Sequence, residues 1–520
     1  MAFKTKEQIE ARMFKPTQEQ KDNLALLKTG NNVKIIAGPG SGKSSSLRYN
    51  AANMPHKQFL VLCFNAANAE ESNNHPDKPD NITYCTGHSL AHKAVMDTAL
   101  RKKLGPYLNY VQLPINDSEI KELLDTNSKN SKDLDKHIMY VYRAMLDCIV
   151  KFCRSDELDI QNFTEDYINY IFNYLAEKQD SLSLTEYGRD LVIDRIVIYW
   201  NNLINSNTNV TITHDVYLKM YQLSQRIIKE VWDKKAKCYV IPDIIALDEA
   251  QDTNPVMQAI FEIQPHQRLI IGDPMQQLYT WRGAGDAMNC FNDFTVGYLT
   301  ESFRFNNTIA SIANKILANV DNKMRVKGSS TKTEINTYAH LCRTNASVVE
   351  RIFAELETGR RVYTSIKVSD VFSKLFHMQS CFFGETPRYP NSELSSIIDK
   401  KSLIKALEFS EELKRLDNLR QCIIEQGYTL LSAKNALDTI IVKKPEQANI
   451  VVSTIHASKG LEYDHVTIDN DFLTIKEDTE IADAIDMLWN TEALYCMLFV
   501  GVTRARVSCA LPCYLEEELL

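Results

Sequence analysis

A glycine-rich loop that follows an apolar segment constrains the fold of this chain more than any other feature. The apolar run VKIIAG begins at Val33, and the helix-forming sequence SSSLRYNAAN comes after the loop. Glycines let successive backbone N–H groups point inward, and the helix N-terminus adds positive potential, so the loop forms a cradle for phosphate. The loop consists of Ala37, Gly38, Pro39, Gly40, Ser41, Gly42, Lys43 and Ser44. A strand, such a loop and a helix in this order predict an α/β fold with a parallel sheet.

Two side chains of the loop indicate that the phosphate belongs to a nucleotide. Lys43 can reach the β- and γ-phosphates, and the Ser44 hydroxyl can bind Mg²⁺. The strict pattern has glycine where Ala37 stands, although the other three glycines are present. We therefore predict ATP and Mg²⁺ binding, with an ordinary glycine-rich turn as the alternative.

A pair of acidic residues supplies the remaining groups that ATP hydrolysis requires. Asp248 and Glu249 come directly after the apolar segment IIAL. We predict that Asp248 is a second ligand of the metal and that Glu249 is the base for the attacking water. Two neighbouring acids after a strand usually belong to a solvated loop, and only the phosphate loop favours the catalytic interpretation.

Several short apolar runs end in Gly, Asp or Thr, as buried parallel strands do. They are VKIIAG, FLVLCF, DIIALD, RLIIGD and NIVVST, which begin at residues 33, 59, 243, 268 and 449. Helical spacing separates them in two places, as in the sequence FTEDYINYIFNYLAEK, whose aromatic residues we expect to face a helix core. The chain therefore reads as two α/β domains, each interrupted by a mainly helical insertion. The predicted ranges are 1–95 with 228–296 for the first domain, 96–227 for its insertion, 297–368 with 445–520 for the second domain, and 369–444 for the smaller insertion.

Composition narrows the class of protein. The net charge of −8 disfavours nucleic-acid binding through an overall positive field, although a local basic cleft is compatible with it. The twelve cysteines include no CxxC pair, which predicts reduced thiols rather than a zinc site or disulfides. No run of 18 apolar residues and no signal peptide are visible, so we predict a cytoplasmic protein without membrane contact.

One string carries a specific resemblance. GDPMQQLYTWRGA, from Gly272 to Ala284, is similar to the GDxxQxIYxWRGA motif of the UvrD-like helicases of superfamily 1, a family of 3′-to-5′ DNA motors that includes the F-box DNA helicases. Further strings follow in family order: TQEQ from Thr17, Phe64-Asn65, TGHSL from Thr86, SFR from Ser302, TIHASKGLE from Thr454 and VGVTRA from Val500. The resemblance implies two RecA-like P-loop NTPase domains.

The same resemblance assigns roles at the nucleotide. Gln276 resembles the residue that senses the γ-phosphate, and Arg304 and Arg504 are the candidate cations for charge that develops on it. The other implied nucleotide contacts are Phe303 and Gln20 at adenine, Glu462 at the ribose, and Gly460. Gln18 is the alternative to Gln20, which the spacing from Thr17 favours. Because both arginines lie in the second domain, ATP is expected to bind in a cleft between the domains and close it.

Contacts with the DNA strand are expected to rely on base stacking and on binding of the sugar–phosphate backbone, because a motor must move along DNA of any sequence. The implied DNA-binding residues are Phe64, Asn65, His88, Tyr279, Trp281, Arg282, Thr454 and His456. The expected partners are single-stranded DNA and duplex junctions, with a protein partner in a repair, phage or defence complex.

The predicted function is therefore ATP-dependent movement and unwinding of DNA in the 3′-to-5′ direction, in repair, recombination or replication. One alternative is a single-strand translocase, or a motor subunit of a phage or anti-phage complex, without processive unwinding. A nucleotide-gated DNA-binding module that has lost catalysis is another, and the intact catalytic residues disfavour it. Segment EALYCML, from Glu492, lacks the basic residues that many relatives carry there.

Overall fold

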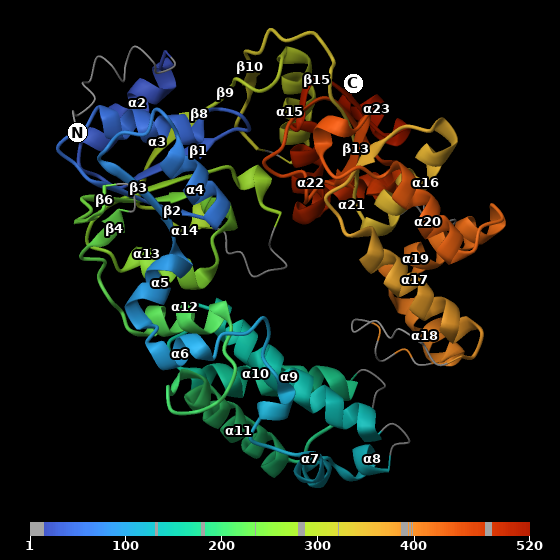
Figure 1. The fold of residues 1–520 in the computed structure, drawn as a ribbon. Coiled ribbons are helices and arrows are strands. Elements are labelled where there is room, and N and C mark those ends of the chain that lie inside the picture. The colour runs from blue at the N-terminus through green and yellow to red at the C-terminus, as the bar shows by residue number, and fades with distance from the viewer. Residues whose placement is uncertain are drawn as a thin grey trace. The chain divides into compact units, whose positions relative to one another are not determined.

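The computed structural model separates the chain into two units. It describes residues 15–130, 134–177, 182–233, 236–278, 287–320, 322–385, 394, 397, 399–473 and 481–520. The first unit contains the chain up to residue 37, residues 43–274, and the segment that ends at Leu299. The second unit contains Gly38–Gly42, Met275–Leu278 and Thr300–Leu520. Each unit has its own sheet and core (Figure 1).

The first unit is built on a six-stranded sheet in the order β3-β2-β6-β7-β1-β8, in which every pairing is parallel. Its strands are β1 Val33–Ala37, β2 Phe59–Cys63, β3 Ile82–Thr86, β6 Ile244–Asp248, β7 Gln267–Gly272 and β8 Thr295–Leu299. Helices α2 Gln18–Lys28, α3 Lys43–Ala52, α4 Ala66–Asn74, α13 Pro255–Glu262 and α14 Ala287–Cys290 accompany it. The apolar runs read as buried strands are strands, and their loops emerge at the carboxyl edge of the sheet.

A helical insertion follows β3 and forms a lobe of the first unit (Figure 1). It comprises α5 Gly87–Val95, α6 Thr98–Lys102, α7 Asp117–Leu123, α8 Thr126–Lys129, α9 Leu134–Arg154, α10 Ile160–Glu177, α11 Glu186–Ile204 and α12 His214–Leu223, before the hairpin β4 Val231–Asp233 and β5 Cys238–Val240. Phe152 and Phe172 are buried in its core. The expectation that the α10 aromatics all face the core is wrong for Tyr170 and Tyr174, which are 68% and 44% exposed.

The second unit contains a parallel five-stranded sheet in the order β12-β13-β11-β14-β15. Its strands are β11 Tyr338–Cys342, β12 Val362–Tyr363, β13 Ile450–Thr454, β14 Tyr463–Ile468 and β15 Ala505–Ala510, and a separate pair is β9 Glu301–Ser302 with β10 Lys327–Gly328. The helices beside these strands are α15 Asn307–Asn319, α16 Asn345–Thr358, α21 Ile481–Asn490, α22 Glu492–Val502 and α23 Cys513–Leu519.

A second, smaller insertion lies between β12 and β13. It consists of α17 Val368–Phe382, α18 Lys400–Phe409, α19 Glu411–Glu425 and α20 Leu430–Ile440, which share one apolar core with α16. The predicted fold class, two parallel α/β sheets each interrupted by helices, is confirmed, whereas the exact domain boundaries stay predictions. Among the helices that the structure describes, none is both long and apolar enough to cross a membrane.

Candidate nucleotide and strand sites

The glycine-rich loop connects β1 to α3 in a conformation that needs its glycines. Gly40 and Gly42 have φ of +67° and +81°, a region that L side chains rarely adopt. A Cβ on Gly40 would lie 2.5 Å from the Arg304 Cβ and 2.9 Å from the Ser302 Oγ. The Gly40 carbonyl accepts a hydrogen bond from the Phe303 N–H at 2.9 Å. The loop is therefore a tight backbone structure of the kind that presents N–H groups to phosphate.

Lys43, Asp248 and Glu249 are brought together at the carboxyl edge of the first sheet. Lys43 begins α3, and its Nζ lies 3.8 Å from Glu249 Oε2. Asp248 is the last residue of β6 and is buried. Glu249 follows with φ of +53°, a strained conformation for a residue with a side chain, and such strain is typical of active sites.

The pKa of Asp248 is raised to about 7 because burial and the neighbouring Glu249 disfavour its charged form, while Lys43 acts in the opposite direction. A divalent cation beside Asp248 would supply the charge that keeps the carboxylate ionised. Ser44, half-buried in the first turn of α3, would add a hydroxyl oxygen. Oxygen donors of this kind suit Mg²⁺, so the donor set fits the metal that the sequence predicts.

Gln251 is a positioning residue that the sequence did not single out. It is fully buried, its Nε2 donates to Glu249 Oε2 at 2.7 Å, and its Oε1 accepts from the Asp273 N–H at 3.0 Å. It therefore ties Glu249 to the loop after β7. Its place two residues after Glu249, inside the string DEAQD, was the signal that could have identified it.

Gln20 is buried and bonded to protein groups, unlike an exposed side chain that would contact adenine. It is buried, its Oε1 accepts from the Thr17 N–H at 3.0 Å, and its Nε2 donates to Ser46 Oγ on α3 at 3.0 Å. It thus joins the capping box of α2 to the helix that follows the phosphate loop. The adenine contact of Gln20 stays a prediction.

In the second unit, Gln276 is bonded to two basic residues. Arg504 Nη2 donates to Gln276 Oε1 at 3.1 Å, and Lys459 Nζ donates to the Gln276 carbonyl at 2.7 Å. Arg504 is only 1% exposed, and it also donates to the Val500 carbonyl at 3.1 Å. A buried guanidinium is thereby fixed against the amide predicted to sense the γ-phosphate.

Glu462 holds the other predicted cation. Arg304 Nε donates to Glu462 Oε1 at 2.8 Å, and Arg506 donates to Oε2 through Nε and Nη2, both at 3.1 Å. Burial raises the pKa of Glu462, but the two arginines outweigh burial and lower it. Arg304 Nη1 also donates to the Thr503 carbonyl at 3.1 Å. The arrangement orients Arg304, and the ribose contact predicted for Glu462 stays a prediction.

Of the other predicted residues of the second unit, Phe303 follows β9, and the rest lie at or after the end of β13. Thr454 is buried there and its Oγ1 accepts from the Ala457 N–H at 3.2 Å. His456 and Phe303 are half-buried, and Gly460 is exposed with φ of +88°.

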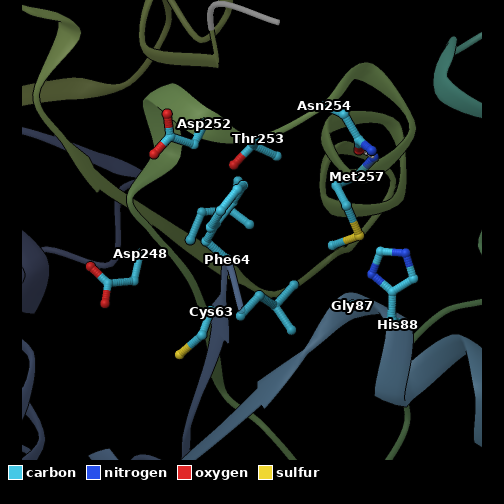
Figure 2. A pocket seen from close by; sticks show the side chains of 11 residues that line it. Cys63, Phe64, Gly87, His88, Asp248, Asp252, Thr253, Asn254 and Met257 are labelled. Atoms are coloured by element: carbon cyan, nitrogen blue, oxygen red, sulfur yellow. Dashed lines mark hydrogen bonds between the residues drawn. The ribbon is translucent and has the colours of Figure 1, made fainter. Parts of the chain in front are cut away.

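Phe64 lines a cavity of about 80 Å³ in the first unit. Figure 2 shows Phe64 in the middle of the lining residues, with Asp248 on one side and Met257 and His88 on the other. Phe64 is 41% exposed, so solvent reaches part of its side chain. Asn65 comes next and caps α4, because its Oδ1 accepts from the Asn68 N–H at 2.8 Å. Phe64 and His88, two of the predicted strand contacts, thus line the same cavity as Asp248, the predicted metal ligand.

His88 also borders an open depression between α5 and α12. Its lining residues are Thr86, His88, Ser89, His92, Lys93, His214 and Tyr217. His88 and His92 share one face of α5, and both rings contact the Tyr217 ring edge-on, with centroids 6.0 and 5.6 Å away. The nearby carboxylate of Asp215 lies 3.0 Å from Arg154 Nε and 3.8 Å from His88 Nε2. Basic and hydrogen-bonding side chains therefore dominate the depression.

Comparison with known proteins identifies the family. Residues 17–294, just over half of the 520, match the UvrD/REP helicase N-terminal domain. The chain belongs to the UvrD/REP helicase family. F-box DNA helicase 1 of Gallus gallus is 26% identical over 97% of this chain and 50% of its own length. F-box DNA helicase protein 1 of Schizosaccharomyces pombe is 25% identical over 94% and 56%, and DNA helicase II of Rickettsia typhi is 24% identical over 61% and 47%. The chain thus spans about half the length of these relatives.

Part of the helicase string lies outside the residues that the structure describes. Tyr279, Trp281 and Arg282 are in that part, so their predicted strand contacts stay predictions. Eight residues predicted to act on ATP or its metal lie within the described ranges. Lys43, Ser44, Asp248 and Glu249 belong to the first unit, and Gln276, Arg304, Arg504 and Glu462 belong to the second.

Proposed function

We propose that this chain is an ATP-driven DNA motor that hydrolyses ATP when bound to single-stranded DNA and moves in the 3′-to-5′ direction. The observation that carries the proposal is the bond from the buried Arg504 to Gln276. Through this contact, the amide predicted to sense the γ-phosphate positions the guanidinium predicted to stabilise the transition state. ATP hydrolysis requires a positioned cation at the γ-phosphate, whereas nucleotide binding alone does not.

ATP is the substrate and Mg²⁺ the metal in this proposal. The backbone N–H groups of Gly38, Gly40, Ser41 and Gly42 and the Lys43 ammonium would hold the phosphates, and Ser44 and Asp248 would hold Mg²⁺. When bound, the metal neutralises charge on the phosphate oxygens. Glu249, oriented by Gln251, accepts a proton from the attacking water.

Strand binding in the first unit is assigned to the Phe64 cavity and the depression between α5 and α12. Stacking on an exposed aromatic is worth about 1–3 kcal/mol per base and accepts any base. Lys93 and the histidines of the depression would bind the phosphodiester backbone. Both features suit a motor that reads no sequence.

The chain is expected to unwind duplexes that carry a 3′ single-stranded tail and to leave 5′-tailed duplexes intact. Fluorescence from a displaced labelled strand, with ATP and Mg²⁺ present, measures this directly. The names of the F-box DNA helicase and DNA helicase II relatives support unwinding. Preference for the 5′ tail would contradict the direction. Displacement of streptavidin from 5′-biotinylated but not 3′-biotinylated single strands, without any duplex unwinding, would favour the translocase alternative.

Replacing Lys93 by alanine should weaken single-strand affinity to a similar degree for every sequence. One lost phosphate contact lowers the slope of log affinity against log salt concentration by about 0.7 for a single strand. Fluorescence anisotropy over a salt series checks this. Lys121→Ala, which removes an exposed helical lysine elsewhere in the same unit, is the matched control and should leave the slope unchanged. An unchanged slope in Lys93→Ala would remove the depression from the strand site.

The relatives also suggest the biological setting. They are DNA helicases by name, and the proposed substrates are accordingly single-stranded DNA and duplex junctions. A protein partner in a repair, phage or defence complex belongs to the same proposal. Isolation of the chain with cross-linked partners on tailed DNA tests it.

A further inference from the structure

Three side chains with metal-binding atoms meet at one end of the second sheet. His340 and Cys342 are alternate residues of β11, so their side chains lie on the same face. β14 pairs in parallel with β11, with Leu341 opposite Ile468, which places Asp469 beside Cys342. The Asp469 N–H donates to the Leu341 carbonyl at 2.9 Å, and this bond extends the pairing to the aspartate.

The ligand atoms of these three residues are close enough to share one ion. The His340 nitrogen, Cys342 sulfur and Asp469 oxygen all lie within 4.8 Å of one another. His340 Nε2 and Asp469 Oδ2 are 2.6 Å apart, a hydrogen-bond distance. Two ligands of a tetrahedral zinc with bonds of about 2.0 Å are separated by about 3.3 Å, so a small side-chain rotation would admit the ion.

The surroundings orient the aspartate, and two of the three side chains are partly exposed. Asp469 Oδ1 accepts from the Asp471 N–H at 2.8 Å, the kind of outer contact that fixes a metal-binding carboxylate. Cys342 is fully buried, whereas the side chains of His340 and Asp469 are 11% and 21% exposed. Solvent therefore reaches part of the imidazole and of the carboxylate, and a water molecule can complete a tetrahedron.

The charges around the cluster also favour a cation. Glu350 and Asp471 lie near Asp469, and burial together with these two aspartates raises the pKa of Glu350. Arg351 and Arg415 supply the opposing positive charge on this side. Binding of the ion by the Cys342 thiolate would release the thiol proton to solvent.

We propose that His340, Cys342 and Asp469 form a binding site for one Zn²⁺ ion, which ties the end of β11 to the end of β14. A set of imidazole, thiolate and carboxylate ligands selects zinc and similar transition metals over Mg²⁺. The spacing of cysteines along the chain predicted no zinc site, because this set is assembled from two strands that are distant in sequence. The site is separate from the residues proposed to bind ATP, and its test does not depend on ATP hydrolysis.

The test uses Co²⁺ as a spectroscopic substitute for Zn²⁺ on the full chain after dialysis against a chelator. We expect one equivalent of Co²⁺ to give the near-ultraviolet charge-transfer band of a cobalt–thiolate bond, and one equivalent of Zn²⁺ to remove it. Cys342→Ser should abolish the band, and His340→Gln and Asp469→Asn should each weaken Co²⁺ affinity by at least about 10-fold. Zn²⁺ should also raise the melting temperature of the wild-type chain.

Cys381→Ser is the matched control, because Cys381 is another buried cysteine of the second unit and its Sγ contacts the Ile397 carbonyl. It should keep the band. No band in the wild type, or a band that persists in Cys342→Ser, would overturn the proposal and leave a His340–Asp469 hydrogen-bonded pair. If Cys342→Ser does not fold, the two other variants decide: unchanged Co²⁺ affinity in both excludes the site.

Discussion

Replacing Lys43 by alanine is expected to reduce single-strand-stimulated ATP turnover by at least about 10³-fold, which corresponds to about 4 kcal/mol of transition-state stabilisation. Lys43 begins the helix after the phosphate loop, is 12% exposed at its side chain, and lies 3.8 Å from Glu249. The substitution removes the cation that reaches the β- and γ-phosphates. It also removes the positive charge that opposes the raised pKa of Asp248, so the carboxylate proposed to hold Mg²⁺ becomes harder to ionise.

Phosphate release at saturating single-stranded DNA measures the turnover of the Lys43 variant. Lys57→Ala is a suitable control, because Lys57 belongs to the same unit and forms an exposed ion pair with Asp243 at 3.2 Å. Exposed pairs contribute about 0–1 kcal/mol to stability, so this variant should fold and turn over normally. Circular dichroism must show that both variants are folded. Turnover of Lys43→Ala close to that of Lys57→Ala would end the motor proposal.

The side chains predicted to act on ATP could be placed from sequence because each lies within a short local pattern. Lys43 sits in the loop between a strand and a helix, and Asp248 and Glu249 follow a buried strand directly. Parallel strands bring their carboxyl ends to one edge of a sheet, so these residues meet once the strands are assigned. The 3.8 Å separation of Lys43 and Glu249 agrees with that expectation.

Contacts that depend on tertiary packing could not be predicted in the same way. His214 and Tyr217 reach the depression beside His88 from the far end of the helical insertion, and nothing in their local sequence indicates this. Gln20 matched a motif, yet its burial and its bond to Ser46 follow from how α2 packs on α3. We predicted that the aromatic residues of α10 face the helix core, but some of its tyrosines lie outside the buried face of the helix.

Replacing Arg504 by alanine should lower turnover by about 10³ to 10⁵-fold while ATP binding is largely kept. Arg504 is buried, and the bonds described above run to uncharged oxygens of Gln276 and Val500. A buried cation is most strongly stabilised when negative charge develops beside it. The loss should therefore appear in kcat rather than in the equilibrium affinity for ATP. Arg504→Lys keeps the charge without the planar fork, so it should recover only part of the turnover.

A double-mutant cycle with Gln276→Ala distinguishes a shared catalytic role from two separate ones. If the bond of Arg504 Nη2 to Gln276 Oε1 positions the guanidinium, the double variant should lose no more than Arg504→Ala alone, because the two residues then act as one unit. Arg325→Ala is the control, since Arg325 is an exposed arginine of the same unit that also donates to backbone carbonyls. Fully additive losses would separate γ-phosphate sensing from charge stabilisation, and unchanged kcat in Arg504→Ala would assign this buried arginine to folding alone.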